Sequence, residues 1–196
     1  MLGNIKYPIA LSGKASSGKD TVAKIIVDLL YMHRTQVDAL ANPMKHIIQI
    51  MFPQCSEECL FGASEYRSTI ISEAYLDKNG HHLTYRQALL DIGAFARSYN
   101  KDIWLHALVD GAKKDTTVHI ISDVRYRNEF DFFKKRQFTM IRIKRTDHTK
   151  IDDPSETEQD GISDDEFDYT VDNNSTLENL QNKVSDIILH LQKSAV

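Results

Sequence analysis

Two patterns of apolar residues alternate along the chain. Short apolar runs that end at turn residues predict buried strands, and apolar residues that recur every three or four positions predict helices. The strands are expected at 7–11, 37–41, 118–122, 138–143 and 168–172, and the helices at 19–33, 43–52, 85–99, 103–113, 128–135 and 177–191. Strands and helices in this order are typical of a mostly parallel sheet covered by helices on both faces.

Residues 54–84 interrupt this alternation. Their hydrophobic periodicity is weak and they contain turn signals such as Asn79-Gly80, which is typical of an insertion. Acidic residues dominate between Asp147 and Asp172, where Gly161 and a proline indicate a loop rather than a domain boundary. We therefore expect one domain over residues 1–196, with an inserted lobe at 54–100 and a long loop at 145–166.

The composition of the 196 residues mainly excludes classes of protein. Hydrophobic residues make up 41% and charged residues 27%, which are ordinary globular proportions. The net charge of −4 argues against a protein that coats nucleic acid, and no apolar run approaches the ~20 residues of a membrane span. Two cysteines, Cys55 and Cys59, cannot build a disulfide framework, and no leader pattern opens the sequence. We expect a cytoplasmic protein without nucleic-acid or membrane partners.

The most specific motif lies between the first predicted strand and the first predicted helix. Residues 13–19 match the pattern G-x-x-x-x-G-K. In this context the glycines let backbone N–H groups turn inward around a phosphate, and Lys19 can reach the terminal phosphates of a nucleotide. A Gly- and Ser-rich turn that arose by chance is the alternative. The residues expected to bind ATP are Gly13, Lys14, Ser16, Ser17, Gly18, Lys19, Asp20 and Thr21.

Asp20 departs from the general motif, in which a Ser or Thr that ligates Mg²⁺ follows the lysine. A carboxylate is a suitable ligand for this hard cation, so Asp20 is the predicted metal residue and Thr21 is expected to contact a phosphate. The alternative is that Asp20 only favours the helix start electrostatically.

A second group of polar residues follows the strand predicted at 118–122. Asp123 and Arg125 share a face of an extended segment, and Glu129 lies on the next helix. Ligands of open parallel sheets gather at the carboxyl ends of the strands, so these three residues are candidates to bind an acceptor. A structural ion pair between Asp123 and Arg125 is the alternative.

Further candidates lie in and around the predicted lobe. Arg86 and Gly93 lie on one predicted helix and Trp104 on the next. Arginine suits phosphate and tryptophan offers a stacking face, which favours a nucleotide pocket, with ordinary core packing as the alternative for Trp104. Lys45 and Arg67 are candidates to bind phosphate, with solvated surface charges as the alternative.

Together these motifs resemble the phage-type deoxynucleoside monophosphate kinases, which are P-loop enzymes that phosphorylate deoxynucleotides with ATP. The resemblance covers nearly the whole chain and is weakest over 54–84. The matching blocks are Ser12-Gly13-Lys14 through Lys19-Asp20-Thr21, Ala41-Asn42-Pro43-Met44-Lys45, Arg86 through Gly93, Asp102-Ile103-Trp104, Ser122-Asp123-Val124-Arg125 with Asn128-Glu129, and Ser155-Glu156 with Asp168 through Asn173.

The resemblance implies an α/β P-loop NTPase fold of three layers, with a helical acceptor-binding lobe at 54–100. It implies transfer of a phosphoryl group from ATP, with Mg²⁺, to a deoxynucleoside 5′-monophosphate, and it suggests a homodimer of phage origin. Lys19, Arg86 and Arg125 would be catalytic. Residues 54–84 of the lobe and the loop at 145–166 are expected to close over the ligands, with Arg142, Lys144 and Arg145 joining from the side of the loop. The residues expected to bind the substrate are Lys45, Arg67, Arg86, Gly93, Trp104, Asp123, Arg125 and Glu129.

Two alternatives stay open at this point. Animal-type phosphomevalonate kinases have a similar Ser-Gly-Lys-Asp loop, Ser-Asp-x-Arg strand and acidic tail, and fold analogy alone does not separate the two families. The helix with Arg86 and Gly93 and the Asp-Ile-Trp block favour a nucleotide acceptor. A regulatory P-loop protein that binds a nucleotide without phosphoryl transfer is the other alternative.

Overall fold

The computed structural model describes residues 8–31, 33–111, 118–146 and 158–194. The chain divides into two compact units, of which one combines Met1–Ala39 with Gly111–Val196 and the other is Leu40–Asp110. The lobe predicted at 54–100 lies within the second unit. No helix in the described ranges is long and apolar enough to cross a bilayer.

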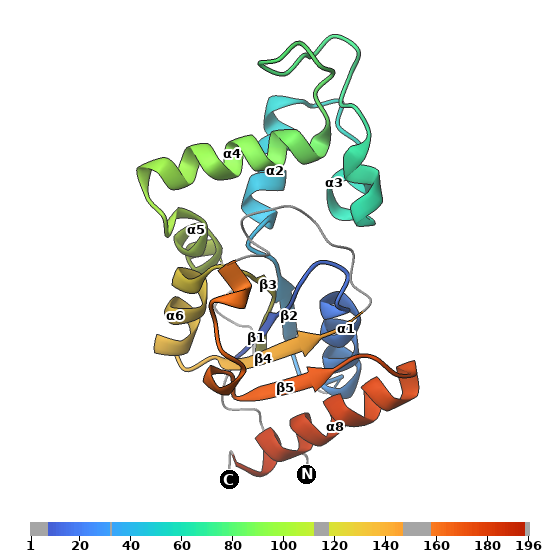
Figure 1. The fold of residues 1–196 in the computed structure, drawn as a ribbon, viewed down its shortest axis with the longest axis vertical. Helices are drawn as coiled ribbons and strands as arrows, with labels where there is room; N and C mark the ends of the chain where they lie inside the picture. Colours follow the sequence, from blue (N-terminus) through green and yellow to red (C-terminus); the bar gives the residue numbers. More distant parts are fainter. Residues whose placement is uncertain (1–7, 32, 112–117, 147–157, 195–196) are drawn as a thin grey trace. The chain divides into compact units, whose positions relative to one another are not determined.

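The first unit is built on a five-stranded sheet in which every pair of neighbouring strands is parallel (Figure 1). The strands are β1 (Ile9–Ser12), β2 (Thr35–Asp38), β3 (Val118–Val124), β4 (Thr139–Lys144) and β5 (Tyr169–Asp172), in the order β2-β3-β1-β4-β5. The predicted parallel sheet is confirmed. β1 lies at its centre, where both faces are covered, and its four residues are all buried.

The strand predicted at 37–41 is wrong in its position. β2 pairs Thr35–Asp38 with Val118–Ile121 of β3 and ends at Asp38. β2 is an edge strand, which needs only one pairing partner and tolerates polar side chains such as Thr35 and Gln36. The apolar residue that suggested a longer strand, Leu40, is buried in the second unit.

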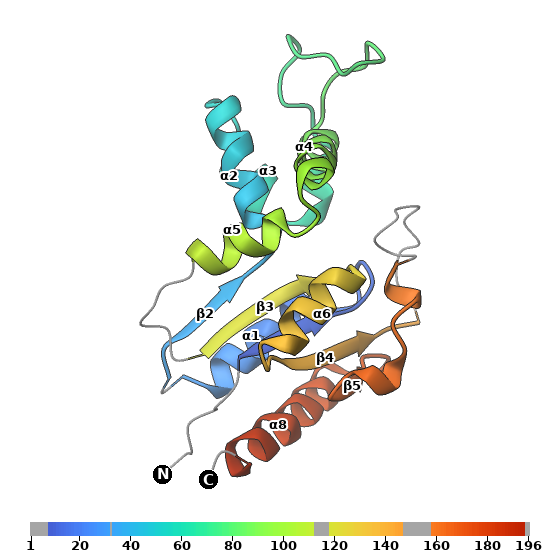
Figure 2. The ribbon, with the colours of Figure 1, turned by 90° about the vertical axis from the view of Figure 1, so that its left-hand side faces the viewer.

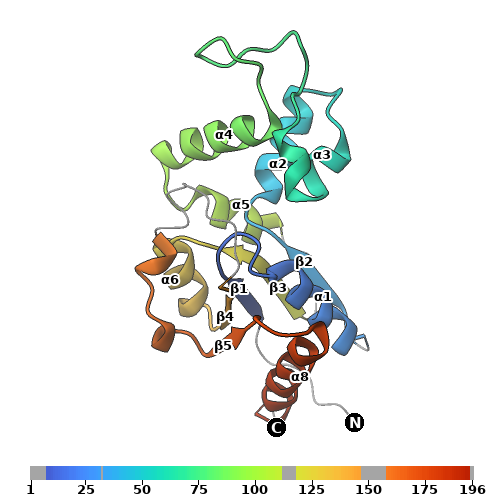
Figure 3. The same ribbon diagram turned by 45° about the vertical axis from the view of Figure 1, so that its right-hand side comes forward.

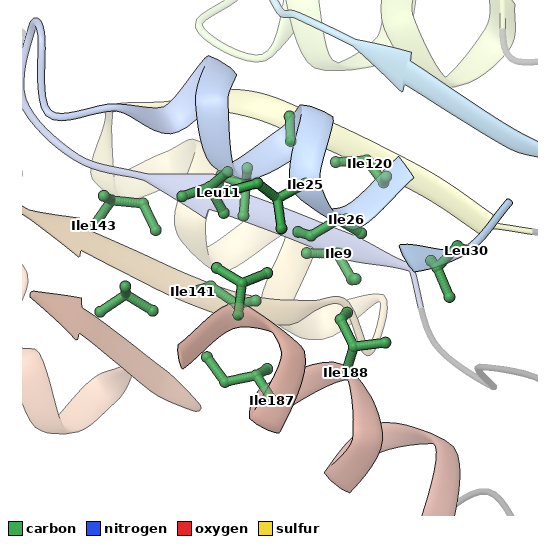
Figure 4. Close-up of a cluster of buried hydrophobic side chains, with 14 of the residues drawn as sticks. Ile9, Leu11, Ile25, Ile26, Leu30, Ile120, Ile141, Ile143, Ile187 and Ile188 are labelled. Atoms are coloured by element: carbon green, nitrogen blue, oxygen red, sulfur yellow. The ribbon is translucent and has the colours of Figure 1, made fainter. Parts of the chain in front are cut away.

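Helices cover both faces of the sheet. α1 (Lys19–Leu29) and α8 (Leu177–Lys193) pack on one face, and α6 (Arg127–Lys135) lies on the other (Figure 2). Figure 4 shows the core on the face that carries α1 and α8. There, Ile9 and Leu11 of β1 contact Ile25 and Ile26 of α1 and two isoleucines of α8. The three-layer P-loop NTPase fold expected from the sequence is therefore present.

The second unit is mainly helical (Figure 3). It contains α2 (Asn42–Met51), α3 (Glu57–Phe61), the 3₁₀ helix η1 (Ser64–Ser68), α4 (Tyr85–Tyr99) and most of α5 (Ile103–Gly111). Its core consists of Ile48, Leu60, Ile71, Tyr85 and Ala88. α3 and η1 were missed by the periodicity, because each has only five residues and Leu60 is the one buried residue of α3.

Candidate functional site

The loop between β1 and α1 joins the carboxyl end of a central strand to a helix N-terminus. Residues 13–18 form this loop, and it turns tightly, with the Ser17 N–H donating to the Lys14 carbonyl at 3.2 Å. Ser16 and Gly18 have positive φ angles of 59° and 100°. Left-handed residues in such a loop direct successive N–H groups to one side, which is the geometry of an anion-binding nest.

The two glycines of the motif are required by close approaches. A Cβ at Gly13 would lie 2.5 Å from the Ile143 carbonyl oxygen and 2.6 Å from the Ser17 hydroxyl. A Cβ at Gly18 would overlap the side-chain amide of Asn173, and a φ of 100° is strained for any residue with a Cβ. The loop therefore depends on glycine at both positions.

The Lys19 ammonium lies over the loop. Its side chain is buried, and Nζ donates to the Gly13 carbonyl at 2.6 Å and to the Lys14 carbonyl at 2.8 Å. Within the described residues, the buried Ser17 hydroxyl has no hydrogen-bond partner. The buried Lys19 ammonium and the buried Ser17 hydroxyl can both donate hydrogen bonds to the oxygens of a phosphate.

A cavity of about 400 Å³ opens beside the loop. It is lined by Gly13, Lys14 and Ser17, by residues 142–145 at the end of β4, and by Gln159, Asp160 and residues 162–164. All of these residues belong to the first unit. The cavity lies within the common size range of small-molecule pockets, roughly 300–1,000 Å³.

Ion pairs connect the walls of this cavity. Lys14 pairs with Asp160 at 2.8 Å, while Arg142 and Lys144 pair with Asp164 at 2.8 and 2.6 Å. The hydrogen bond from Lys144, supported by the charge of Arg142, holds the pKa of Asp164 below its ordinary value, although partial burial opposes this shift. The cavity thus carries basic side chains whose charges are balanced by carboxylates of the 159–164 segment.

The Arg142 side chain binds backbone carbonyls of the 159–164 segment. Its guanidinium donates to the carbonyls of Gln159 and Ile162, both at 2.5 Å, and lies 4.8 Å from the ring centre of Phe167. These contacts attach the 159–164 segment to β4. The predicted loop at 145–166 is described only at 145–146 and 158–166, so its centre lies outside the described residues.

The group predicted after residue 122 lies at the carboxyl end of β3, which extends to Val124 and so includes Asp123. This end lies at the same edge of the sheet as the loop, because Val124 pairs with Ser12 of β1. Glu129 is buried, and its carboxylate accepts the backbone N–H groups of Arg125 at 2.8 Å and Tyr126 at 3.0 Å. Asp123 and Arg125 are half-buried. Glu129 therefore holds the backbone of Arg125, and its carboxylate is engaged at the start of α6.

The remaining predicted substrate residues lie in the second unit. Lys45 is buried, with Nζ 3.5 Å from Asn42 Oδ1 and 5.0 Å from the ring centre of Phe61. Arg67 donates to the carbonyls of Leu60 and Gly62, both at 3.4 Å, at the end of α3.

Trp104 and Gly93 are in direct contact. Trp104 is buried, and its indole N–H donates to the Gly93 carbonyl at 3.3 Å. A Cβ at Gly93 would lie 3.1 Å from Met44 Sδ, so α2 approaches α4 closely at this glycine. Arg86 is half-buried in the first turn of α4. The burial of Trp104 is that of a core side chain, and its contact with a base stays a prediction.

Asn173 ends one of the blocks that carry the family resemblance, but the sequence assigned it no role in the site. Directly after β5, its side-chain Nδ2 donates to the Ser17 carbonyl at 2.8 Å, and its backbone N–H donates to the Lys144 carbonyl at 2.7 Å. A polar residue after a strand usually indicates a turn, so the residues around Asn173 did not indicate a contact across 156 positions.

The oxygen donors near the loop fit a hard divalent cation. Asp20 and Thr21 are exposed in the first turn of α1, and Asp123 is the penultimate residue of β3. Across the described ranges, no group of three or more His, Cys, Asp or Glu side chains could hold a metal by itself. Mg²⁺ is commonly held by one or two carboxylates together with substrate phosphates, which such a donor set permits.

Comparisons with known proteins agree with this site. The deoxynucleotide monophosphate kinase family matches residues 84–184, just over half of the chain. A protein of Acanthamoeba polyphaga mimivirus, provisionally named a deoxynucleotide monophosphate kinase, is 27% identical over 90% of this chain and 93% of its own.

The fold has relatives among solved structures. A gluconokinase from Sinorhizobium meliloti 1021 superposes with a TM-score of 0.50 at 12% identity, covering 97% of this chain and 96% of that one. At this identity the likeness bears on the fold alone. Since the family match includes the end of β3 with Arg125, and a phosphate-binding loop precedes it, the chain belongs to the deoxynucleotide monophosphate kinase family and is a nucleotide-binding phosphotransferase.

Proposed function

We propose that this protein transfers the γ-phosphoryl group of ATP to the 5′-phosphate of a deoxynucleoside monophosphate, giving ADP and a deoxynucleoside diphosphate. The observation that carries the proposal is the loop at residues 13–19, in which a buried Lys19 ammonium is held by two loop carbonyls. A phosphate chain that enters the nest offers this ammonium stronger, charged partners.

The donor side of the reaction requires positioning and charge stabilisation. In the transfer, charge is spread over the equatorial oxygens of the moving phosphoryl group, and little covalent chemistry is left to the protein. Lys19 and the loop N–H groups would stabilise this charge. When bound, Mg²⁺ would neutralise charge on the phosphate oxygens, and Asp20, Thr21 and Asp123 are the residues proposed to hold it.

The acceptor side requires cations rather than a general base, because a 5′-phosphate is already an anion at pH 7. Arg125 is the proposed acceptor ligand in the first unit, where Glu129 fixes its backbone. Lys45, Arg67 and Arg86 are the proposed cations of the second unit. Arginine suits this task because its planar guanidinium binds phosphate oxygens in pairs.

The proposal is tested by a coupled assay of ADP release. Each deoxynucleoside monophosphate, each ribonucleotide counterpart and phosphomevalonate are offered separately as acceptors, with ATP and Mg²⁺. Turnover with one or more deoxynucleotides supports the proposal. Turnover with phosphomevalonate alone, or ATP binding without turnover for any acceptor, would show that the proposed acceptor is wrong.

A matched pair of variants on α1 tests the donor site. Lys19→Met should reduce turnover by at least about 10²-fold, since charged groups aimed at the transferred phosphate contribute on the order of 10³–10⁵ in rate. Lys24→Met removes the same charge from an exposed position of the same helix and should leave turnover unchanged. Equal rates for both variants would remove Lys19 from the mechanism.

A further inference from the structure

The phosphate-binding loop is held by a residue from the far end of the chain. The Asn173 side chain donates to the carbonyl of Ser17 at 2.8 Å, although the two residues are 156 positions apart. The bond is shielded, since Ser17 is buried and Asn173 is half-buried.

This bond fixes the orientation of the whole Ser17–Gly18 peptide, not only that of the Ser17 carbonyl. The chain has no cis peptide in its described part, so the Ser17 C=O and the Gly18 N–H lie on opposite sides of one planar peptide. Holding the carbonyl oxygen towards Asn173 therefore directs the Gly18 N–H away from Asn173. That N–H is one of the loop donors available to a phosphate, at the position immediately before Lys19.

The conformation of Gly18 agrees with this coupling. Its φ of 100° lets the peptide turn so that the preceding carbonyl reaches Asn173. A Cβ at this position would overlap Asn173 Nδ2, so the amide lies directly against the glycine backbone. Glycine is required here both by its backbone angle and by the neighbouring amide.

Asn173 itself is firmly placed. Its backbone N–H donates to the Lys144 carbonyl at 2.7 Å, which continues the β4–β5 pairing by one residue. The next residue, Asn174, accepts the Thr146 N–H and the Thr146 hydroxyl, both at 2.7 Å. The amide that reaches the loop is thus mounted on the sheet, and an anchored donor is what a loop needs in order to keep one conformation before its ligand arrives.

From these contacts we infer that Asn173 is a positioning residue for the nucleotide: it preorganises the Ser17–Gly18 peptide of the phosphate nest and so increases the affinity for the donor phosphates. The inference rests on the proposed use of this loop for ATP. It assigns no contact between Asn173 and the acceptor.

Two near-isosteric variants test the inference. Asn173→Leu keeps the size of the side chain and removes the donor, while Asn173→Asp replaces the donor by an acceptor that faces the Ser17 carbonyl. The dissociation constant for ATP, measured without acceptor, should rise about tenfold for Asn173→Leu and further for Asn173→Asp. Asn179→Asp, an exposed change in the first turn of α8, is the charge control and should bind ATP like the wild type.

Two further measurements separate positioning from a general loss of structure. At saturating ATP, kcat and the KM for the acceptor should stay near wild-type values, whereas the KM for ATP rises. With ¹⁵N-glycine labelling, the chain gives at most eight glycine amide signals, and the Gly18 signal should shift in Asn173→Leu before any nucleotide is added. Asn173→Ser, which has a shorter hydroxyl donor, should bind ATP more tightly than Asn173→Leu does. It keeps the inference testable if Asn173→Leu fails to fold.

The outcomes are distinct. An unchanged ATP dissociation constant in Asn173→Leu, or equal increases in both KM values, overturns the inference. If the wild type binds ATP but phosphorylates no deoxynucleotide, the proposed acceptor fails and the inference is judged by ATP affinity alone. If the wild type binds no ATP, both proposals fail.

Discussion

The Glu129 carboxylate accepts the backbone N–H of Arg125 at 2.8 Å, and through this bond the first turn of α6 fixes the residue that directly follows β3. Glu129 also accepts the Tyr126 N–H, so one buried carboxylate accepts two backbone N–H groups at the start of α6. The carboxylate thereby links the stability of α6 to the placement of Arg125.

Glu129→Ala should therefore destabilise the protein and weaken acceptor binding together. Two partly buried N–H groups would lose their acceptor, which is expected to lower the free energy of unfolding by about 2 kcal/mol. Urea denaturation measures this change, and the assay of ADP release measures the rise in the acceptor KM. The control is Asp131→Ala two positions along the same helix, where a partly exposed carboxylate pairs with Arg127 and about 0.5 kcal/mol is expected. Equal losses in the two variants would contradict the linking role of Glu129.

Arg125→Ala should reduce turnover far more than it reduces stability. If the guanidinium binds the acceptor phosphate, kcat/KM for the deoxynucleotide should fall by roughly 10²–10³, since phosphate-directed arginines have effects of this order or larger. Arg127→Ala is the matched control, because Arg127 is half-exposed and pairs with Asp131 and Glu166. Wild-type turnover in Arg125→Ala would show that the segment after β3 is only structural.

The features predicted correctly from the sequence are those encoded in a few neighbouring residues. The first strand, the glycine loop and α1 follow each other without a gap, and the apolar runs of β3 and β4 are long enough to identify central strands. β2 was misplaced because an edge strand does not need apolar side chains at every inward position. Local pattern is thus informative where burial is complete.

Local sequence patterns did not predict the contacts between distant segments. Arg142 stands in the alternating stretch Thr139–Lys144, and nothing in its neighbours indicates that its guanidinium reaches the carbonyls of Gln159 and Ile162. Asn173 likewise looks like a turn residue. Both side chains satisfy backbone carbonyls of loops, and partners of this kind depend on tertiary structure rather than on spacing.

The Asp164 carboxylate should make stability depend on pH in the acid range. Lys144 and Arg142 hold its folded pKa below the value in the unfolded chain, so the folded state binds fewer protons there. The stabilisation is complete above the unfolded carboxyl pKa of about 3.9 and is lost as the pH falls through the folded pKa. Asp164→Asn should therefore be less stable than the wild type at pH 7 by about 0.5–1 kcal/mol, because the half-exposed pairs are screened by solvent.

Urea denaturation of this pair of proteins between pH 7 and pH 2.5 checks the expectation. The difference between wild type and Asp164→Asn should shrink as the pH falls. Asp165→Asn removes the same charge from the adjacent exposed residue and should not produce this convergence. A difference for Asp164→Asn that stays constant across the range would show that these ion pairs do not stabilise the fold.

Trp104→Phe distinguishes a core role from a contact with the base of the acceptor. The change removes the indole N–H that donates to the Gly93 carbonyl and leaves space in a buried site, so the second unit should lose about 1–2 kcal/mol of stability. Because the chain has two compact units, hydrogen exchange of α4 and α5 is a better measure than one global transition. Faster exchange in these helices, with an acceptor KM within about twofold of the wild type, is the result expected from the burial of Trp104. A large rise in the acceptor KM with unchanged exchange would instead favour stacking of Trp104 on the base, because a lost stacking contact weakens binding without loosening the helix pair.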